Sequence, residues 1–147
     1  MKARDLMVDV ATVRPEDPAE ILVELLRDPE ARVVAVVKDG GEAVGILTEE
    51  DLLGALLPSY VLADKSLAGV LEEKAGETCR QRLHGRRISD VVDLRRRGRQ
   101  TVEPDDTLIE VGAAMARSNE PGVLVVEGRQ VLGAITVGRL LEALLRR

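Results

Sequence analysis

The sequence predicts an α/β (α+β) protein made of two repeats, each with a strand, a helix, two further strands and a second helix. The segment at residues 44–52, VGILTEEDL, recurs at residues 132–140 as LGAITVGRL. The residues before both copies follow one order of strand-like and helix-like patterns, so the repeat covers most of the chain. A unit of this size cannot bury its own sheet, and two such units are expected to pack sheet to sheet about a pseudo-twofold axis.

The first repeat begins with a short strand and a helix. Residues 11–13, ATV, favour a strand that ends at Pro15. Asp17 is expected to cap the helix that follows, with Pro18 at its first position. The next apolar residues recur at helical spacing and predict one buried face, namely Ile21, Leu22, Leu25 and Leu26.

Two strands and a second helix complete this repeat. Residues 33–37, VVAVV, are mostly β-branched and too few for a helix, so they predict a strand buried on both faces. Residues 39–41, DGG, then predict a turn into a strand at residues 43–47. Thr48 is expected to cap an amphipathic helix, because apolar residues with helical spacing follow it at Leu52, Leu53 and Leu56.

The second repeat follows the same order. Its segments 101–102, 104–106 and 123–126 correspond to residues 12–13, 15–17 and 34–37, and the leading residues 90–92 correspond to residues 5–7. We therefore assign residues 1–57 to the first repeat, 58–87 to a connector and 88–147 to the second repeat. Apolar residues in the connector recur at helical spacings and predict two short helices.

Composition excludes several classes of function. The net charge is −5, and without Phe or Trp the chain lacks the stacking platforms that single-stranded nucleic acid requires. The basic loop from Arg95 to Arg99 is expected to be a solvated surface rather than a nucleic-acid site. With one cysteine, Cys79, and one histidine, His84, the chain predicts no internal disulfide, no zinc cluster and no required cofactor.

Two further absences bear on location and activity. No apolar run is long enough to span a bilayer, and no apolar signal core follows the first residues, so we expect a cytoplasmic protein with no membrane partner. No nucleophile and base are placed together by the sequence, so we expect no enzymatic activity.

Each repeat ends in Gly-apolar-apolar-Thr-x-x-(Asp or Arg)-Leu, at residues 45–52 and 133–140. Two such motifs, each after the same strand and helix order, resemble a tandem pair of CBS domains of the cystathionine β-synthase type, called a Bateman module. The resemblance covers nearly the whole chain except the connector. It implies two β-α-β-β-α units with two clefts between them, which commonly take adenosine-containing ligands such as AMP, ADP, ATP, NAD or S-adenosylmethionine.

The resemblance also implies which residues line the two clefts. In the family the motif Thr contacts phosphate or ribose, the motif Asp accepts hydrogen bonds from the ribose, and the partner repeat holds the adenine. The first cleft would then contain Thr48, Asp51, Thr101, Val102, Glu120, Pro121, Gly122 and Val123. The second would contain Thr136, Arg139, Thr12, Val13, Arg32, Val33 and Val34.

The chain departs from the family pattern at two places. Arg139 has no acceptor for a ribose diol, so the second cleft is expected to be empty or to hold only a phosphate. Glu120 brings a carboxylate to the first cleft, where it would repel phosphates. We therefore expect adenosine or a monophosphate to bind more readily than a triphosphate, in the first cleft only.

Two alternatives stand beside the ligand hypothesis. Thr48 and Asp51 also fit a capping box, in which each residue bonds the backbone of the other and stabilises the helix without any ligand. The whole module could instead be a ligand-free structural or interaction protein that docks a regulated partner. In either case, leucine-rich helices at residues 22–26 and 52–57 are expected to be exposed and to form a homodimer.

Overall fold

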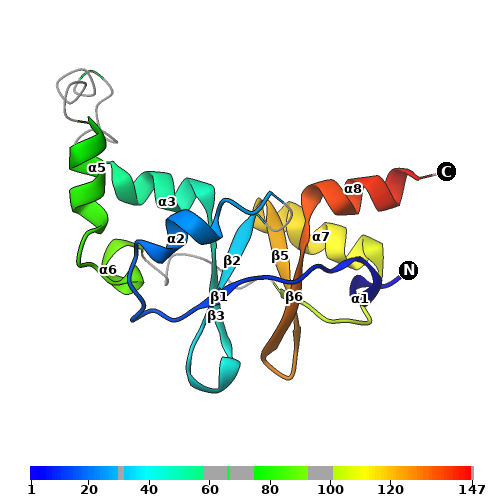
Figure 1. Ribbon diagram of the computed structural model, residues 1–147. Coiled ribbons are helices and arrows are strands. Elements are labelled where there is room, and N and C mark those ends of the chain that lie inside the picture. The colour runs from blue at the N-terminus through cyan, green and yellow to red at the C-terminus, as the bar shows by residue number, and fades with distance from the viewer. Residues whose placement is uncertain (30–31, 58–65, 67–74, 93–100, 147) are drawn as a thin grey trace.

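The protein forms two three-stranded sheets that face each other, with helices around them (Figure 1). This computed structural model describes residues 1–29, 32–57, 66, 75–92 and 101–146. The sheets have the strand orders β1-β2-β3 and β4-β5-β6, one in each repeat. The predicted fold class is confirmed.

In the first repeat, a parallel strand pair is followed by an antiparallel hairpin. The elements are β1 (Thr12–Val13), α2 (Ile21–Leu25), β2 (Val33–Val37), the 3-10 turn η1 (Asp39–Gly41), β3 (Ala43–Thr48) and α3 (Glu49–Leu56). Strand β1 pairs with β2 in parallel, and β2 pairs with β3 antiparallel, with Val33 opposite Thr48. All residues of β2 are buried, as its β-branched run predicts.

The second repeat has the same topology. Its elements are β4 (Thr101–Val102), α7 (Leu108–Ser118), β5 (Gly122–Glu127), β6 (Gln130–Thr136) and α8 (Val137–Leu145). Strand β4 pairs with β5 in parallel, and β5 pairs with β6 antiparallel, with Gly122 opposite Thr136. The repeated motif therefore lies at the same place in both repeats, where the last strand turns into the last helix.

Helix α2 begins later than the sequence predicts. Pro18 forms a bridge with Arg87, and the Ala19 amide donates to the Arg86 carbonyl at 2.8 Å. The backbone at the expected helix start is therefore hydrogen-bonded to residues that precede the second repeat. Asp17 does not cap α2, because its Oδ2 accepts from the Arg14 amide at 2.8 Å instead.

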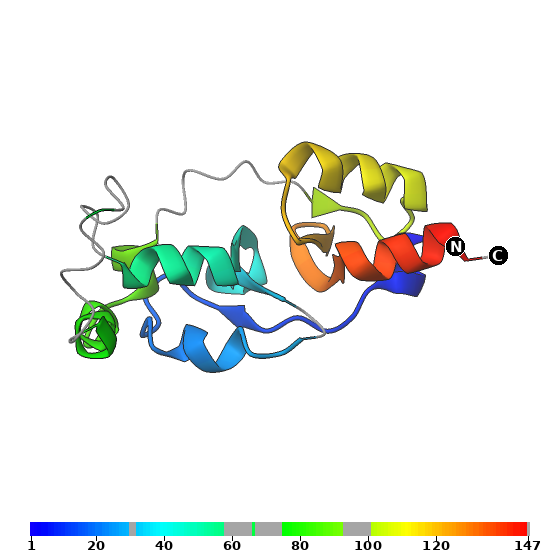
Figure 2. The same ribbon diagram turned by 90° about the horizontal axis from the view of Figure 1, so that it is seen from above.

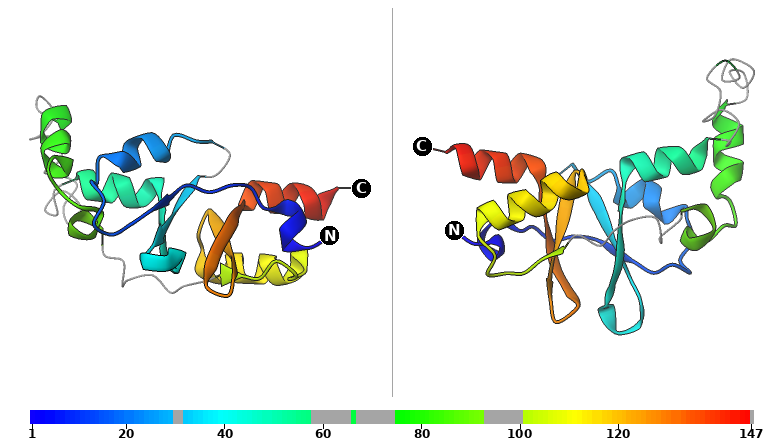
Figure 3. Two further views of the ribbon diagram at one scale, coloured as in Figure 1. Left: turned by 60° about the horizontal axis from the view of Figure 1, so that its bottom comes forward. Right: turned by 180° about the vertical axis from the view of Figure 1, so that it is seen from behind.

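Each repeat is preceded by a short helical segment, which we call its lead, and each lead packs on the other repeat. The short helix α1 (Ala3–Leu6) lies on the second repeat, and α6 (Ile88–Val91) lies on the first (Figures 1 and 3). The exchange is symmetric in its hydrogen bonds. The amides of Ala3 and Arg4 donate to the carbonyls of Asp106 and Pro104, and those of Ile88 and Ser89 donate to Asp17 and Pro15, all at 2.9 Å.

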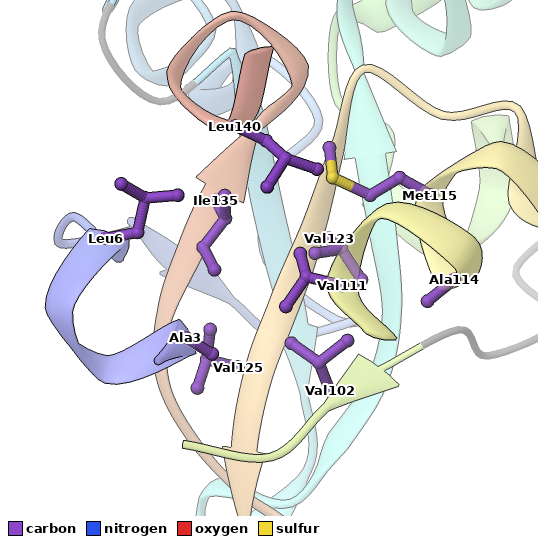
Figure 4. Close-up of a cluster of buried hydrophobic side chains, with 10 residues drawn as sticks. All are labelled: Ala3, Leu6, Val102, Val111, Ala114, Met115, Val123, Val125, Ile135 and Leu140. Carbon is purple, nitrogen blue, oxygen red and sulfur yellow. The ribbon is translucent and has the colours of Figure 1, made fainter. Parts of the chain in front are cut away.

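Buried apolar residues form one core in each repeat and a third cluster between the sheets. The core of the second repeat includes Ala3 and Leu6 of α1, which point at β5 and β6 (Figure 4). The core of the first repeat includes Ile88 of α6 in the same way. The cluster between the sheets contains Val33, Ala35, Ala43, Leu124 and Ala134, so the two repeats pack through their sheets as predicted.

The described part of the connector belongs to the first repeat. Helix α5 (Ala75–Leu83) packs on α3, and the Arg82 Nε donates to the Ala55 carbonyl at 3.0 Å near the end of α3. The rest of the predicted connector helices and the basic loop from Arg95 to Arg99 lie outside the described residues. Within those residues, no helix combines the length and the apolar character that a bilayer crossing requires.

Candidate functional site

The end of β3 and the start of α3 form a closed hydrogen-bonded cap. The Thr48 amide and its Oγ1 both donate to Oδ2 of Asp51, at 2.8 and 3.1 Å, and the Asp51 amide donates to Thr48 Oγ1 at 3.3 Å. Thr48 is only 1% exposed. The capping box that the sequence predicts is therefore present, and it places the motif threonine and aspartate in direct contact.

The corresponding cap on α8 is built differently. The Arg139 amide donates to Thr136 Oγ1 at 3.3 Å, so the threonine caps the helix as Thr48 does. No acidic residue stands in the first turn of α8. Instead, the Arg139 Nε donates to the Leu6 carbonyl at 2.9 Å, at the end of α1. Asp51 and Arg139 thus occupy the same motif position but have different partners. Asp51 accepts hydrogen bonds from the capping Thr48, whereas Arg139 donates to the end of α1.

A cavity of about 720 Å³ lies where the two repeats meet on the helical face. Seen from above, α3 and α8 run outward from the middle of the molecule and α7 lies beside α8 (Figure 2). We call this space the central cavity. Its lining residues are Thr48, Glu50, Gly112, Met115, Ala116, Asn119, Glu120, Pro121, Val137, Leu140, Leu141 and Leu144.

Part of the predicted first cleft lines the central cavity. Thr48 comes from the first repeat, and Glu120 and Pro121 come from the loop between α7 and β5 of the second, so the structure brings these predicted residues together. Asp51 is not a lining residue but bonds Thr48 directly. The other predicted residues are not in the lining: Thr101 is exposed, and Val102, Gly122 and Val123 are buried.

The residues predicted for the second cleft do not line the central cavity. Thr12 and Arg32 are exposed, whereas Val13, Val33, Val34 and Thr136 are buried. Val33 packs near Gly122, where a Cβ would lie 3.2 Å from Val33 Cγ1 and 3.2 Å from the Ile135 carbonyl. The glycine at this position therefore lets the two sheets approach closely.

Most of the apolar wall of the central cavity was not predicted. It is formed by α7 and α8, in which Met115 and Leu140 are buried and Leu141 and Leu144 are 50% and 40% exposed. The helical spacing of these leucines predicts an amphipathic helix, but it does not reveal that part of the apolar face stays uncovered. Asn119, which ends α7 in the left-handed conformation, adds a polar group to the rim.

The central cavity has the chemistry of a small-molecule site. Apolar side chains of α7 and α8 contribute to its lining, together with the polar groups of Thr48, Glu50, Asn119 and Glu120. Its volume falls within the range of about 300 to 1,000 Å³ that is usual for ligand pockets. None of the described lining residues is a lysine or an arginine, so these residues offer no cationic partner to a polyphosphate.

Comparison with known proteins identifies the repeat. The sequence profile of the CBS domain matches residues 3–58 and again residues 88–146. No protein of curated function matches the chain significantly.

Solved structures of CBS-domain proteins are similar over the whole chain. A CBS domain-containing protein of unknown function from Kribbella flavida is 32% identical, with a TM-score of 0.82 and 99% of both chains covered. The CBS domain of a membrane protein from Sphaerobacter thermophilus is 23% identical, with a TM-score of 0.73 over 100% of this chain and 90% of that one.

A third similar structure was solved with a nucleotide. CBSX2, known from Arabidopsis thaliana, has been solved in complex with AMP, and this structure is 18% identical, with a TM-score of 0.66 over 98% of this chain and 96% of that one. At this identity the similarity establishes the fold alone. The two profile matches and the Kribbella relative establish more than that: the chain belongs to the CBS domain family and carries a tandem pair of these domains.

Proposed function

We propose that this CBS pair is a regulatory module, without catalytic activity of its own, that binds an adenosine-containing ligand in the central cavity. The observation that carries the proposal is the meeting of Thr48, from the motif of the first repeat, with Glu120 and Pro121 of the second repeat in one cavity. The AMP complex of a structurally similar CBS pair supports the ligand class.

The lining suggests how such a ligand would lie. A purine ring is flat and apolar on its faces, so we expect it against Met115 and Leu140. The ribose would then face Thr48, whose Oγ1 donates to Asp51 Oδ2, because a carboxylate is an acceptor-only group that suits ribose hydroxyls. Because Glu50 and Glu120 line the cavity, adenosine or AMP is expected to bind more tightly than ATP.

Filling the cavity tests the proposal. Ala116 lines the cavity and is exposed, so Ala116→Phe is expected to fold normally and to weaken binding of adenosine or AMP by about tenfold or more through steric overlap. Ala113 is exposed on the same helix but is not a lining residue, so Ala113→Phe is the matched control. Isothermal titration of the three proteins with adenosine, AMP, ATP and S-adenosylmethionine measures the difference.

Two results would count against this function. One is that none of these compounds binds the wild type or raises its melting temperature. The other is equal weakening by Ala113→Phe and Ala116→Phe, since that would place the ligand elsewhere. A ligand at one hundred times its dissociation constant should stabilise the folded protein by about 2.7 kcal/mol, which a thermal shift detects readily.

A homodimer is the second candidate function, and exposed apolar residues on the helical face favour it. They include Leu53 of the predicted segment 52–57, whereas Leu22 and Leu26 of the predicted segment 22–26 are buried in the core of the first repeat. In the described helices, the exposed large apolar residues are Ile21, Leu53, Ile109, Val137, Leu141, Leu144 and Leu145. Leu53 and Leu141 each follow the motif of their repeat directly, so both repeats would contribute to one interface.

Negative charges at these exposed apolar residues are expected to dissociate the homodimer. Ile109 and Leu145 are 72% and 76% exposed and do not line the cavity, so Ile109→Asp with Leu145→Asp should leave the fold intact. Sedimentation of the wild type at roughly tens of micromolar should show a dimer, and the double variant a monomer. A wild type that stays monomeric under these conditions would argue against the dimer.

A further inference from the structure

Asn119 is a polar residue at the C-terminal end of α7 that lines the central cavity. The cavity-lining residues of this helix and its cap are Gly112, Met115, Ala116 and Asn119. Their spacing of three and four places them on one face of α7, with Asn119 about one turn beyond Met115. Asn119 therefore follows directly on the apolar surface against which we expect the purine to lie.

The backbone around Asn119 is held by hydrogen bonds on both sides. Its amide donates to the Met115 carbonyl at 3.0 Å, and the Ser118 hydroxyl donates to the same carbonyl at 3.2 Å. Two residues after Asn119, the Pro121 carbonyl accepts from the Val137 amide at 3.0 Å, at the start of α8. The side chain of Asn119 thus projects from a backbone segment that is tied to both α7 and α8.

The end of the helix does not itself require an asparagine. Asn119 adopts the left-handed conformation, with φ 56° and ψ 35°. Glycine is the usual residue there because it has no Cβ to strain the backbone, and asparagine is the common alternative. The conformation therefore explains glycine or asparagine at this position, and only asparagine adds a carboxamide.

This carboxamide supplies a chemistry that the other lining side chains lack. Among the described lining residues, Asn119 has the one side chain with N–H donors. Glu50 and Glu120 carry carboxylates, which accept hydrogen bonds and do not donate them. The Thr48 hydroxyl donates to Asp51 Oδ2, so its hydrogen lies in the cap. A ligand atom that needs an N–H donor from a side chain of this lining therefore has Asn119 as its partner.

We infer that Asn119 selects the base of the ligand by pairing with the edge of adenine that carries N6 and N7. Its carbonyl oxygen accepts from the N6 amino group and its own amino group donates to N7, which is the pairing that suits asparagine and adenine. Guanine and hypoxanthine present acceptors at both positions, O6 and N7, so a carboxamide matches only one of them. The inference rests on the proposed function, because it names the group that recognises the base in the central cavity.

The analogue 7-deazaadenosine tests this pairing, because a C–H group replaces the N7 acceptor and the N6 amino group is kept. The wild type should bind adenosine about three- to tenfold more tightly than 7-deazaadenosine, as expected for one lost hydrogen bond. Adenosine should also bind about tenfold more tightly than inosine, which loses the bidentate contact. Titration calorimetry with the three nucleosides measures both differences.

Asn119→Gly is the variant that separates the carboxamide from the helix end. It keeps a residue suited to the left-handed conformation and removes the two hydrogen-bonding groups. It should bind adenosine about tenfold more weakly than the wild type does, and it should no longer distinguish adenosine from 7-deazaadenosine. Circular dichroism checks that the variant is folded.

Asn119→Asp decides the case if Asn119→Gly does not fold. Aspartate has nearly the same shape and also tolerates the left-handed conformation, but its carboxylate has no donor and repels the lone pair of N7. This variant should therefore bind 7-deazaadenosine more tightly than adenosine, which is the reverse of the wild-type order.

The outcomes separate this inference from the proposed function. If the wild type binds adenosine and 7-deazaadenosine equally well, or if folded Asn119→Gly keeps the wild-type preference, the role of Asn119 is wrong and the ligand class stands. Tighter binding of guanosine than of adenosine would also overturn the inference, since carboxylates suit the N1 and N2 donors of guanine. If the wild type binds none of these nucleosides, the proposed function fails and this inference fails with it.

Discussion

Replacing Ile88 by alanine is expected to lower the free energy of unfolding by about 2 to 5 kcal/mol, the range for removing a large buried aliphatic side chain. Ile88 is 0% exposed, although it lies beyond the connector and is assigned by sequence to the second repeat. Its side chain is in the core of the first repeat, with Val13, Leu22 and Leu47. The loss should therefore destabilise the first repeat directly.

Urea unfolding followed by circular dichroism measures this effect. Ile109→Ala is the matched control, because Ile109 is exposed and its loss is expected to change stability by no more than about 0.5 kcal/mol in a monomeric sample. If Ile88→Ala cost less than about 1 kcal/mol, α6 would not be part of the first core.

Replacing Asp51 by alanine is expected to have two separable effects. Loss of the capping box should lower the stability of the free protein by about 1 kcal/mol. If the carboxylate also accepts from a ribose, affinity for adenosine or AMP should fall roughly ten- to a hundredfold, as expected for charge-assisted hydrogen bonds of about 1.5 to 3 kcal/mol. Calorimetric titration and thermal unfolding of the same variant separate the two effects.

The chain supplies two controls for this prediction. Thr107 and Glu110 form the same capping box at the start of α7, and neither lines the central cavity. Glu110→Ala should therefore lower stability by a similar amount and leave affinity unchanged. Arg139→Ala should also leave affinity nearly unchanged. If Asp51→Ala binds as tightly as Glu110→Ala, Asp51 serves only as a cap.

Local patterns predict the elements of this fold well, because each depends on short-range chemistry. The run at residues 33–37 is buried throughout, and Thr48 caps its helix as expected, as Thr136 does at the equivalent position. The exchange of leads could not be predicted in the same way. Apolar residues such as Leu6 and Ile88 predict burial, but their sequence does not specify which repeat buries them.

The candidate site was predictable only in part for a similar reason. The motif identifies Thr48, and the repeat alignment identifies the loop at Glu120 and Pro121, since both are set by position in the repeat. The wall made by Met115 and Leu144 depends on how α7 and α8 leave a gap between them. The contact of Arg139 depends on Leu6 at the end of α1, which lies 133 residues away along the chain.

The exchanged leads also determine how the protein comes apart. The core of each repeat includes residues of a short helix that precedes the other repeat in the chain. Neither repeat can therefore unfold while the other keeps a complete core. The two repeats should then unfold as one cooperative unit, with equal calorimetric and van't Hoff enthalpies. A polypeptide cut between the repeats would yield halves that each lack a core helix and that regain it only by reassociating.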